Sequence, residues 1–244
     1  MLGLVLINKQ NKMKGYRYSD QIPMFGHKDI IGYGTDDFYV EEIERKLAYE
    51  IIIKNHYSKK GDSIAHNKIN LGVFVCGELL GVLQYGYAMN PSSMGSIVKG
   101  TKIDEYLELN RMWLSDDIKI DYPESKAIGY SIKYIKGKVK KIKWIQSFAD
   151  ERCGGLGIVY QAASFCFYGE HISTFWTFEG ETYHNSLITN NKRAKKKELM
   201  DRGFKEKAVK SELRQFRYIK FLNKREKVKC LLEEKPYLKH YNND

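Results

Sequence analysis

The amino-acid sequence predicts an α/β (α+β) protein with a mixed, mostly antiparallel sheet flanked by helices. Strand-like and helix-like segments alternate along most of the 244 residues, which is typical of a sheet packed against helices. Two apolar runs that meet at Gly77 and Glu78 have the pattern of a β-hairpin and supply the antiparallel part. Hydrophobic residues make up 43% of the chain, enough for a buried core, and no run of about 18 apolar residues predicts a membrane span.

The helix predicted nearest the N-terminus depends on spacing. Val40, Ile43, Leu47 and Ile51 recur at three- and four-residue intervals, which predicts a helix that ends near Lys54. The other predicted elements are, in chain order, a first strand in 1–12 in place of a signal peptide, the hairpin in 71–89, a strand in 106–117, a helix in 124–141, a strand in 141–150, a small-residue helix in 157–169, one or two strands in 171–184, a basic helix in 190–204 and a strand in 214–223. This interleaved order is what favours a mixed sheet.

Strict alternation along the strand predicted in 106–117 places Glu108 on one face and Arg111 on the other. A guanidinium on a strand could hold a phosphate or a carboxylate, and Arg111 could equally be an ordinary surface charge. Ser125 and Lys126 stand at the start of the next predicted helix, whose first backbone N–H groups suit an anion such as a phosphate.

The positive charge of the chain is concentrated near the C-terminus. The formal net charge is +11, and residues 192–229 alone hold 16 Lys or Arg against 5 Asp or Glu, a net of +11. The rest of the chain holds 25 basic and 25 acidic residues. A neutral globule with a basic C-terminal extension favours a polyanionic partner such as nucleic acid, with a merely solvated surface as the alternative.

Several enzyme classes lack their motifs in this sequence. It contains neither a GxxxxGK[ST] phosphate loop nor a GxGxxG dinucleotide fingerprint, and HExxH, GxSxG and the zinc-deaminase pattern are also missing. The four cysteines, Cys76, Cys153, Cys166 and Cys230, form no CxxC pair. Cysteine alone therefore does not predict a zinc site.

Three residues have side chains suited to catalysis or metal binding. Asp150 ends a predicted strand, where its carboxylate could accept a proton or bind a metal, although a turn or a helix cap also explains it. Tyr160 could donate a proton to a leaving thiolate or be a core tyrosine. His56 could act as a base or metal ligand, or it could cap the preceding helix.

Four strings in the sequence resemble the Mom family of phage DNA-modification proteins. They are NHYS, LGVFVCGELLGVLQYG, LELNRMWLSDD and SFADERCGGLGIVYQAASFCFYG, and their order and spacing agree across roughly residues 45–185. Proteins of this family are similar to GNAT acyltransferases in fold and convert adenine in DNA to an N6-acetamido (carbamoylmethyl) form, which shields phage DNA from host restriction nucleases. The resemblance implies a GNAT-like fold, a DNA-modifying transferase and action in the host-cell cytoplasm.

The same resemblance implies site residues, a donor and a partner. It points to catalytic residues at His56, Tyr57, Asp150 and Tyr160, to cofactor contacts at Arg111, Ser125 and Lys126, and to iron held by His56 and Asp150. Acetyl-CoA or a related acyl donor and double-stranded DNA are the implied ligands. The first basic residues of the extension would contact DNA, namely Lys192, Arg193, Lys195, Lys196 and Lys197.

DNA as substrate imposes a further requirement. Adenine N6 is buried in base pairing, so the target base must flip out, and aromatic side chains such as Tyr57, Trp113, Phe175 or Trp176 could stack on it. We expect residues 1–190 to form the catalytic domain, and 191–244 to form a basic region that completes the sheet and contacts DNA. An acyltransferase acting on a protein or a small molecule, a non-enzymatic DNA-binding protein and a structural phage protein are the alternatives.

Overall fold

The computed structural model describes residues 14–21, 28–56, 67–88, 90–151, 155–189 and 194–239, so the first strand predicted in 1–12 lies outside the described residues. The elements are β1 (Gly15–Tyr18), β2 (Ile30–Gly34), β3 (Phe38–Glu42), α1 (Arg45–Asn55), β4 (Asn67–Val75), β5 (Glu78–Gly86), the 3-10 helix η2 (Pro91–Ser96), β6 (Tyr106–Leu114), α2 (Pro123–Lys138), β7 (Trp144–Asp150), α3 (Ile158–Ala162), β8 (Cys166–Phe178), β9 (Glu181–His184), α4 (Asn185–Thr189), α5 (Ala194–Asp201), α6 (Phe204–Lys207), β10 (Val209–Phe221) and α7 (Lys224–Lys227). None of the helices among these residues is long and apolar enough to cross a membrane.

The described strands form one sheet in the order β1-β2-β3-β4-β5-β6-β7-β10-β8-β9. Its neighbouring strands pair antiparallel, with the exception of β6 and β7, which are parallel. The predicted mixed, mostly antiparallel sheet flanked by helices is therefore confirmed. The order helix α1, hairpin β4–β5, strand β6, helix α2, strand β7, helix α3 is also the one that a GNAT-like fold implies.

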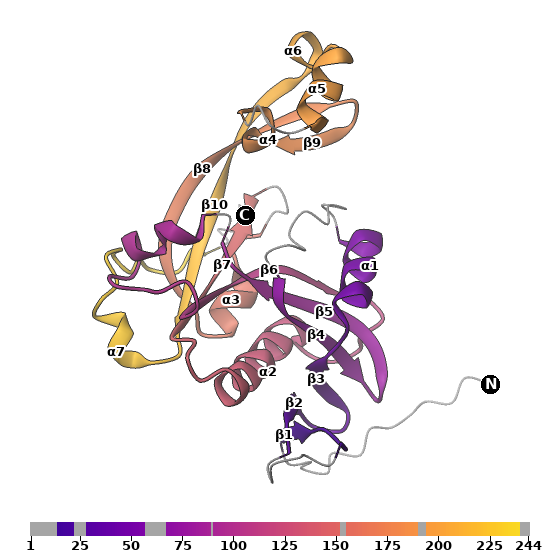
Figure 1. Ribbon diagram of the computed structural model, residues 1–244, viewed down its shortest axis with the longest axis vertical. Coiled ribbons are helices and arrows are strands. Elements are labelled where there is room, and N and C mark those ends of the chain that lie inside the picture. Colours follow the sequence, from indigo (N-terminus) through magenta and orange to yellow (C-terminus); the bar gives the residue numbers. More distant parts are fainter. Residues whose placement is uncertain are drawn as a thin grey trace, which may run out of the picture.

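The two long helices cover opposite faces of the sheet, as Figure 1 shows. Helix α2 contributes Ala127 and Ile128 to the main core, which also contains Leu83 of β5. Helix α1 packs Ile52 against Val82, the neighbour of Leu83 on the same strand. Successive strand residues point to opposite faces, so the α2 face and the α1 face of the sheet are separate surfaces.

The predicted hairpin is confirmed, and its turn has a clear cause. Cys76 and Gly77 between β4 and β5 both have positive φ, 50° and 88°. Two positive φ angles define the turn whose twist matches that of antiparallel strands, and glycine adopts such a conformation without strain.

Two predicted helices are partly wrong. The helix expected from Val40 starts only at Arg45. Val40 instead belongs to strand β3, where every second side chain, Phe38 and Val40, is buried. The small-residue helix expected in 157–169 is limited to α3, since Ser164 has a φ of 61° and Cys166 already begins β8. Tyr160 nevertheless lies on a helix, as predicted.

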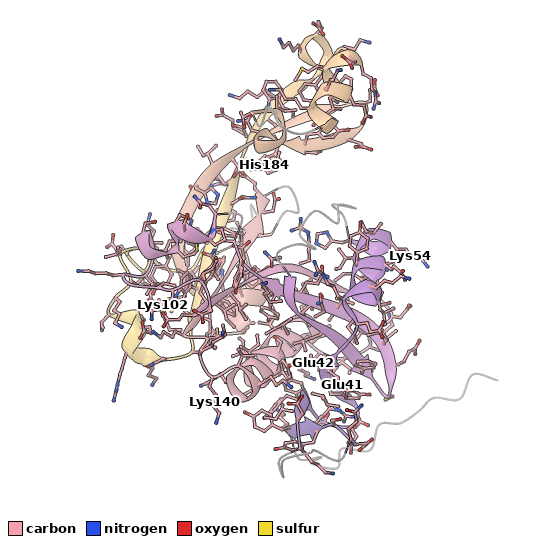
Figure 2. The ribbon with its side chains drawn as sticks, viewed as in Figure 1. Glu41, Glu42, Lys54, Lys102, Lys140 and His184 are labelled. Carbon is pink, nitrogen blue, oxygen red and sulfur yellow. The ribbon has the colours of Figure 1, made fainter. Side chains whose placement is uncertain are left out.

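Strands β8 and β10 extend beyond the rest of the sheet as a two-stranded arm (Figure 1). Only Gln215–Phe221 of β10 pairs with β7, whereas β8 and β10 pair from Val209 onward. The tip of the arm holds β9 and helices α4 to α6 around a core of its own, formed by Phe178, Tyr183, Leu199 and Phe204. Figure 2 labels His184 where this tip joins the arm and Glu42 near the far end of the sheet. The described part of the charge-rich segment 192–229 therefore runs from α5 and α6 at the tip, along β10, to α7 (Lys224–Lys227) at the other end of that strand.

Candidate functional site

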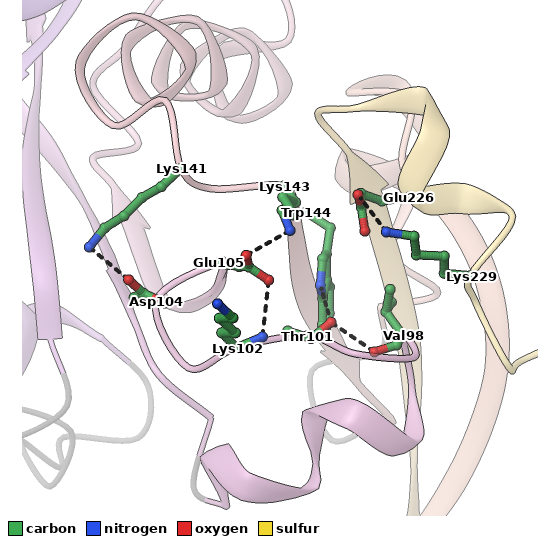
Figure 3. A network of polar contacts seen from close by, with 10 residues as sticks. All are labelled: Val98, Thr101, Lys102, Asp104, Glu105, Lys141, Lys143, Trp144, Glu226 and Lys229. Carbon is green, nitrogen blue, oxygen red and sulfur yellow. Dashed lines mark hydrogen bonds and ion pairs between the residues drawn. The ribbon is translucent and has the colours of Figure 1, made fainter.

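The parallel strands β6 and β7 are held together at their N-terminal ends (Figure 3). Lys143 donates its backbone N–H to the carbonyl oxygen of Glu105 at 2.7 Å, and the Lys143 ammonium lies 2.6 Å from the Glu105 carboxylate. Trp144 donates its indole N–H to the hydroxyl of Thr101 at 3.1 Å. These contacts fix the start of both strands.

Further along, the two strands stop pairing with each other. Their last paired residues are Glu108 and Gln146, after which β6 continues along β5 and β7 continues along β10. A bulge occurs at the same point, because Tyr85 pairs with Leu109 while Gln84 pairs with Arg111. One extra residue in one strand bends it and re-aims its side chains.

Because of the bulge, Arg111 lies on the opposite face of the sheet from the one that strict alternation predicts. Leu109, Met112 and Leu114 all pack against the main core on the α2 face, whereas Trp113 packs with helix α1. Arg111 is therefore on the α1 face, which it shares with Glu108, and strict alternation across Asn110 was a wrong assumption.

Glu108 is the centre of a polar cluster at the end of the parallel pairing. Its carboxylate accepts a hydrogen bond from the Gln146 amide at 2.7 Å and another from the Asn110 amide at 3.2 Å. Burial raises the pKa of Glu108 to about 7, although the hydrogen bond from Gln146 and the positive charges of Arg111 and Arg217 oppose the rise. A carboxyl with such a pKa carries a proton part of the time near neutral pH.

Four buried polar atoms in this cluster have no hydrogen-bond partner within the described part of the chain. Two are acceptors, the side-chain oxygens of Asn110 and Gln146, and two are donors, Nε of Arg111 and one terminal nitrogen of Arg217. Gln146 is only 1% exposed. Native proteins satisfy nearly all buried polar groups, so a concentration of four around one carboxylate is unusual. Each of these atoms is enclosed by the surrounding protein.

The other side of the cluster is formed by β7, β8 and β10. The guanidinium of Arg217 lies 5.0 Å from the ring centroid of Phe148, and His171 meets the same ring edge-on at 5.3 Å. Burial and the charge of Arg217 both lower the pKa of His171. These contacts stiffen the arm where it leaves the sheet.

The α2 face carries a second group of polar side chains. The hydroxyl groups of Tyr85 and Ser131 are 2.5 Å apart, and burial raises the pKa of Tyr85. The ring of Tyr160 is tilted by 36° against that of Tyr218, with 5.5 Å between ring centroids, and Tyr160 also raises the pKa of Tyr85. Gly157, at the start of α3, lies so close to the ring of Tyr218 that a side chain there would collide with it. The glycine-rich turn is what brings Tyr160 to this face.

A groove of about 410 Å³ lies at the first turns of α2. Ser125 and Lys126 line it together with Lys14 and Lys133, so three lysines surround it. Arg111 is not among its lining residues. The structure thus brings together two of the three residues predicted to bind a cofactor and leaves Arg111 with the Glu108 cluster.

The predicted catalytic residues divide between the two faces. His56 is buried at the C-terminal end of α1 and Asp150 ends β7 on the face of Gln146, whereas Tyr160 packs on the α2 face. Tyr57 lies outside the described residues. Among those that the structure describes, no group of three or more His, Cys, Asp or Glu is placed to hold a metal ion. The predicted pair of His56 and Asp150 does not by itself fit a bound iron.

Two of the predicted DNA-contacting residues can be placed, both at the tip of the arm. Lys196 and Lys197 lie on α5, while Lys192, Arg193 and the side chain of Lys195 are outside what the structure describes. The aromatic candidates Trp113, Phe175 and Trp176 are packed positions: Trp113 lies against α1, Phe175 is buried, and the Trp176 indole N–H donates to Asn185 at 3.0 Å.

Sequence reasoning missed Glu108, Gln146 and Arg217 as site residues. The signal for the first two was present, since each is a polar residue in an apolar strand. Arg217 gave no such signal, because it stands among many basic residues and becomes half-buried only when β10 joins the sheet.

Known structures with a similar shape are acetyltransferases. An IAA acetyltransferase from Bacillus cereus shares 8% identity with a TM-score of 0.47, covering 76% of this chain and 99% of that one. A ribosomal-protein-S5-alanine acetyltransferase from Vibrio fischeri shares 9% identity with a TM-score of 0.46, covering 80% and 98%. At these identities and TM-scores, the similarity supports no conclusion about the reaction or the cofactor of this chain.

The sequence comparisons are stronger. The chain is 44% identical over 213 residues to methylcarbamoylase mom of Escherichia phage Mu, which covers 86% of this chain and 87% of that protein. The model of the Mom protein family matches residues 37–239, from strand β3 through the arm to the C-terminal segment. The chain, with its splayed β6–β7 pair and its basic arm, therefore belongs to the Mom protein family.

Proposed function

We propose that the chain is a DNA-modifying transferase that converts adenine to N6-acetamido (carbamoylmethyl) adenine and so protects phage DNA from host restriction. The observation that carries this proposal is the 44% identity to a protein named methylcarbamoylase, over 86% of the chain. The transferred group and the adenine target come from the family resemblance.

The arm supports double-stranded DNA as the partner. Residues 192–229 account for the whole excess positive charge, and they form α5, α6, β10 and α7. An elongated arm that carries basic side chains can follow a phosphate backbone, which binds protein mainly by releasing counterions. We propose that the basic residues in 192–197, of which Lys196 and Lys197 lie on α5 at the tip, make the first of these contacts.

The groove at α2 supports a site for an acyl donor such as acetyl-CoA or a related compound. Ser125 and Lys126 line it, Lys14 and Lys133 add positive charge, and the first N–H groups of a 16-residue helix lie beside it. Phosphates bind at such helix starts because unpaired N–H groups and the helix dipole favour negative charge. The donor would then approach from the α2 face.

The chemistry requires a new bond between adenine N6 and a methylene carbon. N6 is a poor nucleophile because its lone pair is delocalised into the ring, so loss of its proton is the step that needs help. The N6–CH₂ bond forms as the bond between that carbon and a leaving group on the donor breaks, so the donor must be a compound that carries a leaving group there, which acetyl-CoA itself does not. We propose that the Asp150 carboxylate accepts the N6 proton and that the Tyr160 hydroxyl protonates the departing group. Asp150 lies on the α1 face, and Tyr160 lies on the α2 face, where the groove is. His56 would orient the base, and no step is assigned to a metal.

The test is nucleoside analysis of host DNA after expression. Mass spectrometry should detect carbamoylmethyl-adenine with the unaltered protein and at least about tenfold less with Asp150→Ala or Tyr160→Ala, since acid–base catalysis contributes about 10²–10⁴-fold. Asp104→Ala, at a surface ion pair, and Tyr18→Ala, at an exposed position, are the matched controls. Unchanged modification in both site variants would refute these roles. Acyl-CoA turnover without DNA would favour an acyltransferase of other substrates.

A further inference from the structure

A second concentration of positive charge lies at the end of β10 that is opposite to the tip of the arm. The segments 97–105, 136–143 and 222–234 together hold 11 Lys or Arg against 5 Asp or Glu. They meet at an open groove of about 390 Å³, whose lining includes Lys136, Lys140, Lys141, Lys143, Glu105 and Asn223. These three segments are called the basic corner below, and Figure 2 labels Lys102 and Lys140 in it.

Ion pairs within the basic corner leave a surplus of free positive charge. Four of its five acidic side chains form ion pairs of 2.6–3.1 Å, namely Asp104 with Lys141, Glu105 with Lys143, Glu226 with Lys229, and Glu234 with Lys227. Figure 3 shows the first three of these pairs. Six further basic side chains are exposed and form no ion pair within the described part of the chain, namely Lys99, Lys102, Lys136, Lys140, Lys224 and Arg225.

The local structure does not account for this surplus. Lys136 lies in the last turn of α2, where the helix dipole favours positive charge. Lys224 and Arg225 are the first residues of α7, where the same dipole disfavours positive charge. Lys99 and Lys102 belong to neither helix. Like charges gathered on one surface repel each other, so a polyanion bound across them would relieve the repulsion.

The basic corner reaches the face of the sheet on which Asp150 lies. Trp144 and Asp150 are six residues apart on β7, which pairs with β10 without a bulge, so both point to the same face. Val98 belongs with Trp144 to one buried cluster on that face. The backbone N–H of Lys99 donates to the carbonyl oxygen of Lys229 at 2.9 Å, which joins this segment to the end of α7. A duplex lying over Asp150 could therefore also meet the basic corner.

Strand β10 sets the distance between the tip and the basic corner, which lie at its two ends (Figure 1). The strand has 13 residues, Val209–Phe221, and so extends for about 40 Å. Asp150 pairs with Gln215, the middle residue of the strand, which places it about 20 Å from either end. Base pairs follow each other at about 3.4 Å along duplex DNA. Each half of β10 thus corresponds to about six base pairs.

We propose that the basic corner is a second contact to the phosphate backbone of duplex DNA, so that the tip and the corner hold the duplex about six base pairs to either side of the target adenine. The inference rests on the proposed function, which makes DNA the substrate and gives the tip its contact. Phosphate contacts fix the position of a protein on the duplex without reading sequence. Two of them, one on each flank, would hold the duplex while the base between them leaves the stack.

The experiment measures how the affinity of the full chain for duplex DNA depends on salt, by fluorescence anisotropy with a labelled 24-base-pair duplex. Replacing Lys224 and Arg225 together by glutamine removes two exposed charges of the basic corner. Each phosphate contact contributes about 0.9 to the slope of log affinity against log salt. The slope of this corner variant should therefore be shallower than that of the unaltered protein by about 1.8.

Replacing Arg45 and Lys46 together by glutamine is the matched control. These two residues are also adjacent, exposed and the first residues of a helix, and their replacement removes the same net charge. Helix α1, however, packs against Val82 of β5, and β10 lies three strands further along the sheet. The salt slope of this variant should equal that of the unaltered protein.

The length of the duplex tests the spacing. A duplex of eight base pairs is only about 27 Å long and cannot reach from the tip to the basic corner, so it can bind at the tip alone. With this duplex, the corner variant and the unaltered protein should have the same slope. No change with the longer duplex, an equal change with both duplexes, or an equal change in the control variant would overturn the proposal. Modified adenine in host DNA tests the function separately, so a chain that modifies DNA but gives one of these results refutes the second contact alone.

Discussion

The core at the tip of the arm should unfold separately from the sheet when Phe204 is replaced by alanine. Phe204 is 2% exposed, and its ring lies 5.2 Å from that of Phe178, 5.9 Å from that of Trp176 and 6.0 Å from that of Tyr183. Each of the four buried side chains in this core contributes about 1.5–3 kcal/mol. Removing a buried phenylalanine costs about 3–5 kcal/mol, a quarter or more of that gross stabilisation. A core of only four buried side chains should not stay folded after such a loss.

Hydrogen exchange followed by mass spectrometry would detect the difference. In Phe204→Ala, peptides from 178–208 should lose protection while those from the hairpin 67–86 keep it, because the two regions belong to different cores. Val209→Ala, at a 67% exposed position beside the tip, should change neither region. Equal loss of protection in the hairpin, or full protection of the tip, would refute the separation of the two cores.

Three further results are expected. Replacing the three lysines at 195–197 by glutamine should weaken DNA binding about equally for all sequences and reduce the slope of log affinity against log salt; an unchanged slope would contradict the proposed contact. The pKa of Glu108 is raised to about 7 in the folded chain from an ordinary 4.5, so the folded state holds this proton more tightly than the unfolded state does. The stability that Glu108 contributes is therefore present at low pH and is lost as the pH rises through 7. In Glu108→Gln, the urea midpoint should therefore fall less between pH 5 and pH 8 than in the unaltered protein, and parallel curves would argue against the raised pKa. Lys143→Ala, which removes the ion pair with Glu105, should lower Tm by only about 2–4 °C, since such pairs contribute about 0–1 kcal/mol.

Local patterns were enough to predict much of the fold. The hairpin around Gly77, the strand of Arg111 and the helix that begins near Ser125 follow from spacing within a few residues. The errors arose where two periods overlap: Val40 fits a helix with Ile43 and a strand with Phe38, and only pairing of β3 with β4 decides between them. Tertiary pairing routinely overrides such short-range signals.

The candidate site was less predictable because it depends on contacts between distant segments. Asp150 and Tyr160 were identified through the family resemblance, and the structure adds that they lie on different faces of the sheet. The importance of Glu108 depends on a bulge, on the end of the β6–β7 pairing, and on Arg217, which is 109 positions further along the chain. None of these is visible in the residues around Glu108.

The place of β10 in the sheet has a consequence for synthesis of the protein. This strand is the last of the described strands in sequence, yet it lies between β7 and β8 and supplies Arg217 to the site. At about 5–20 residues per second, the ribosome completes β8 several seconds before β10 exists, and during that interval β7 and β8 have exposed edges. A chain cut short before residue 217 would lack Arg217, and no complete strand would lie between β7 and β8. Arg217 therefore joins Glu108 and Gln146 only after β10 has been made and has paired between β7 and β8.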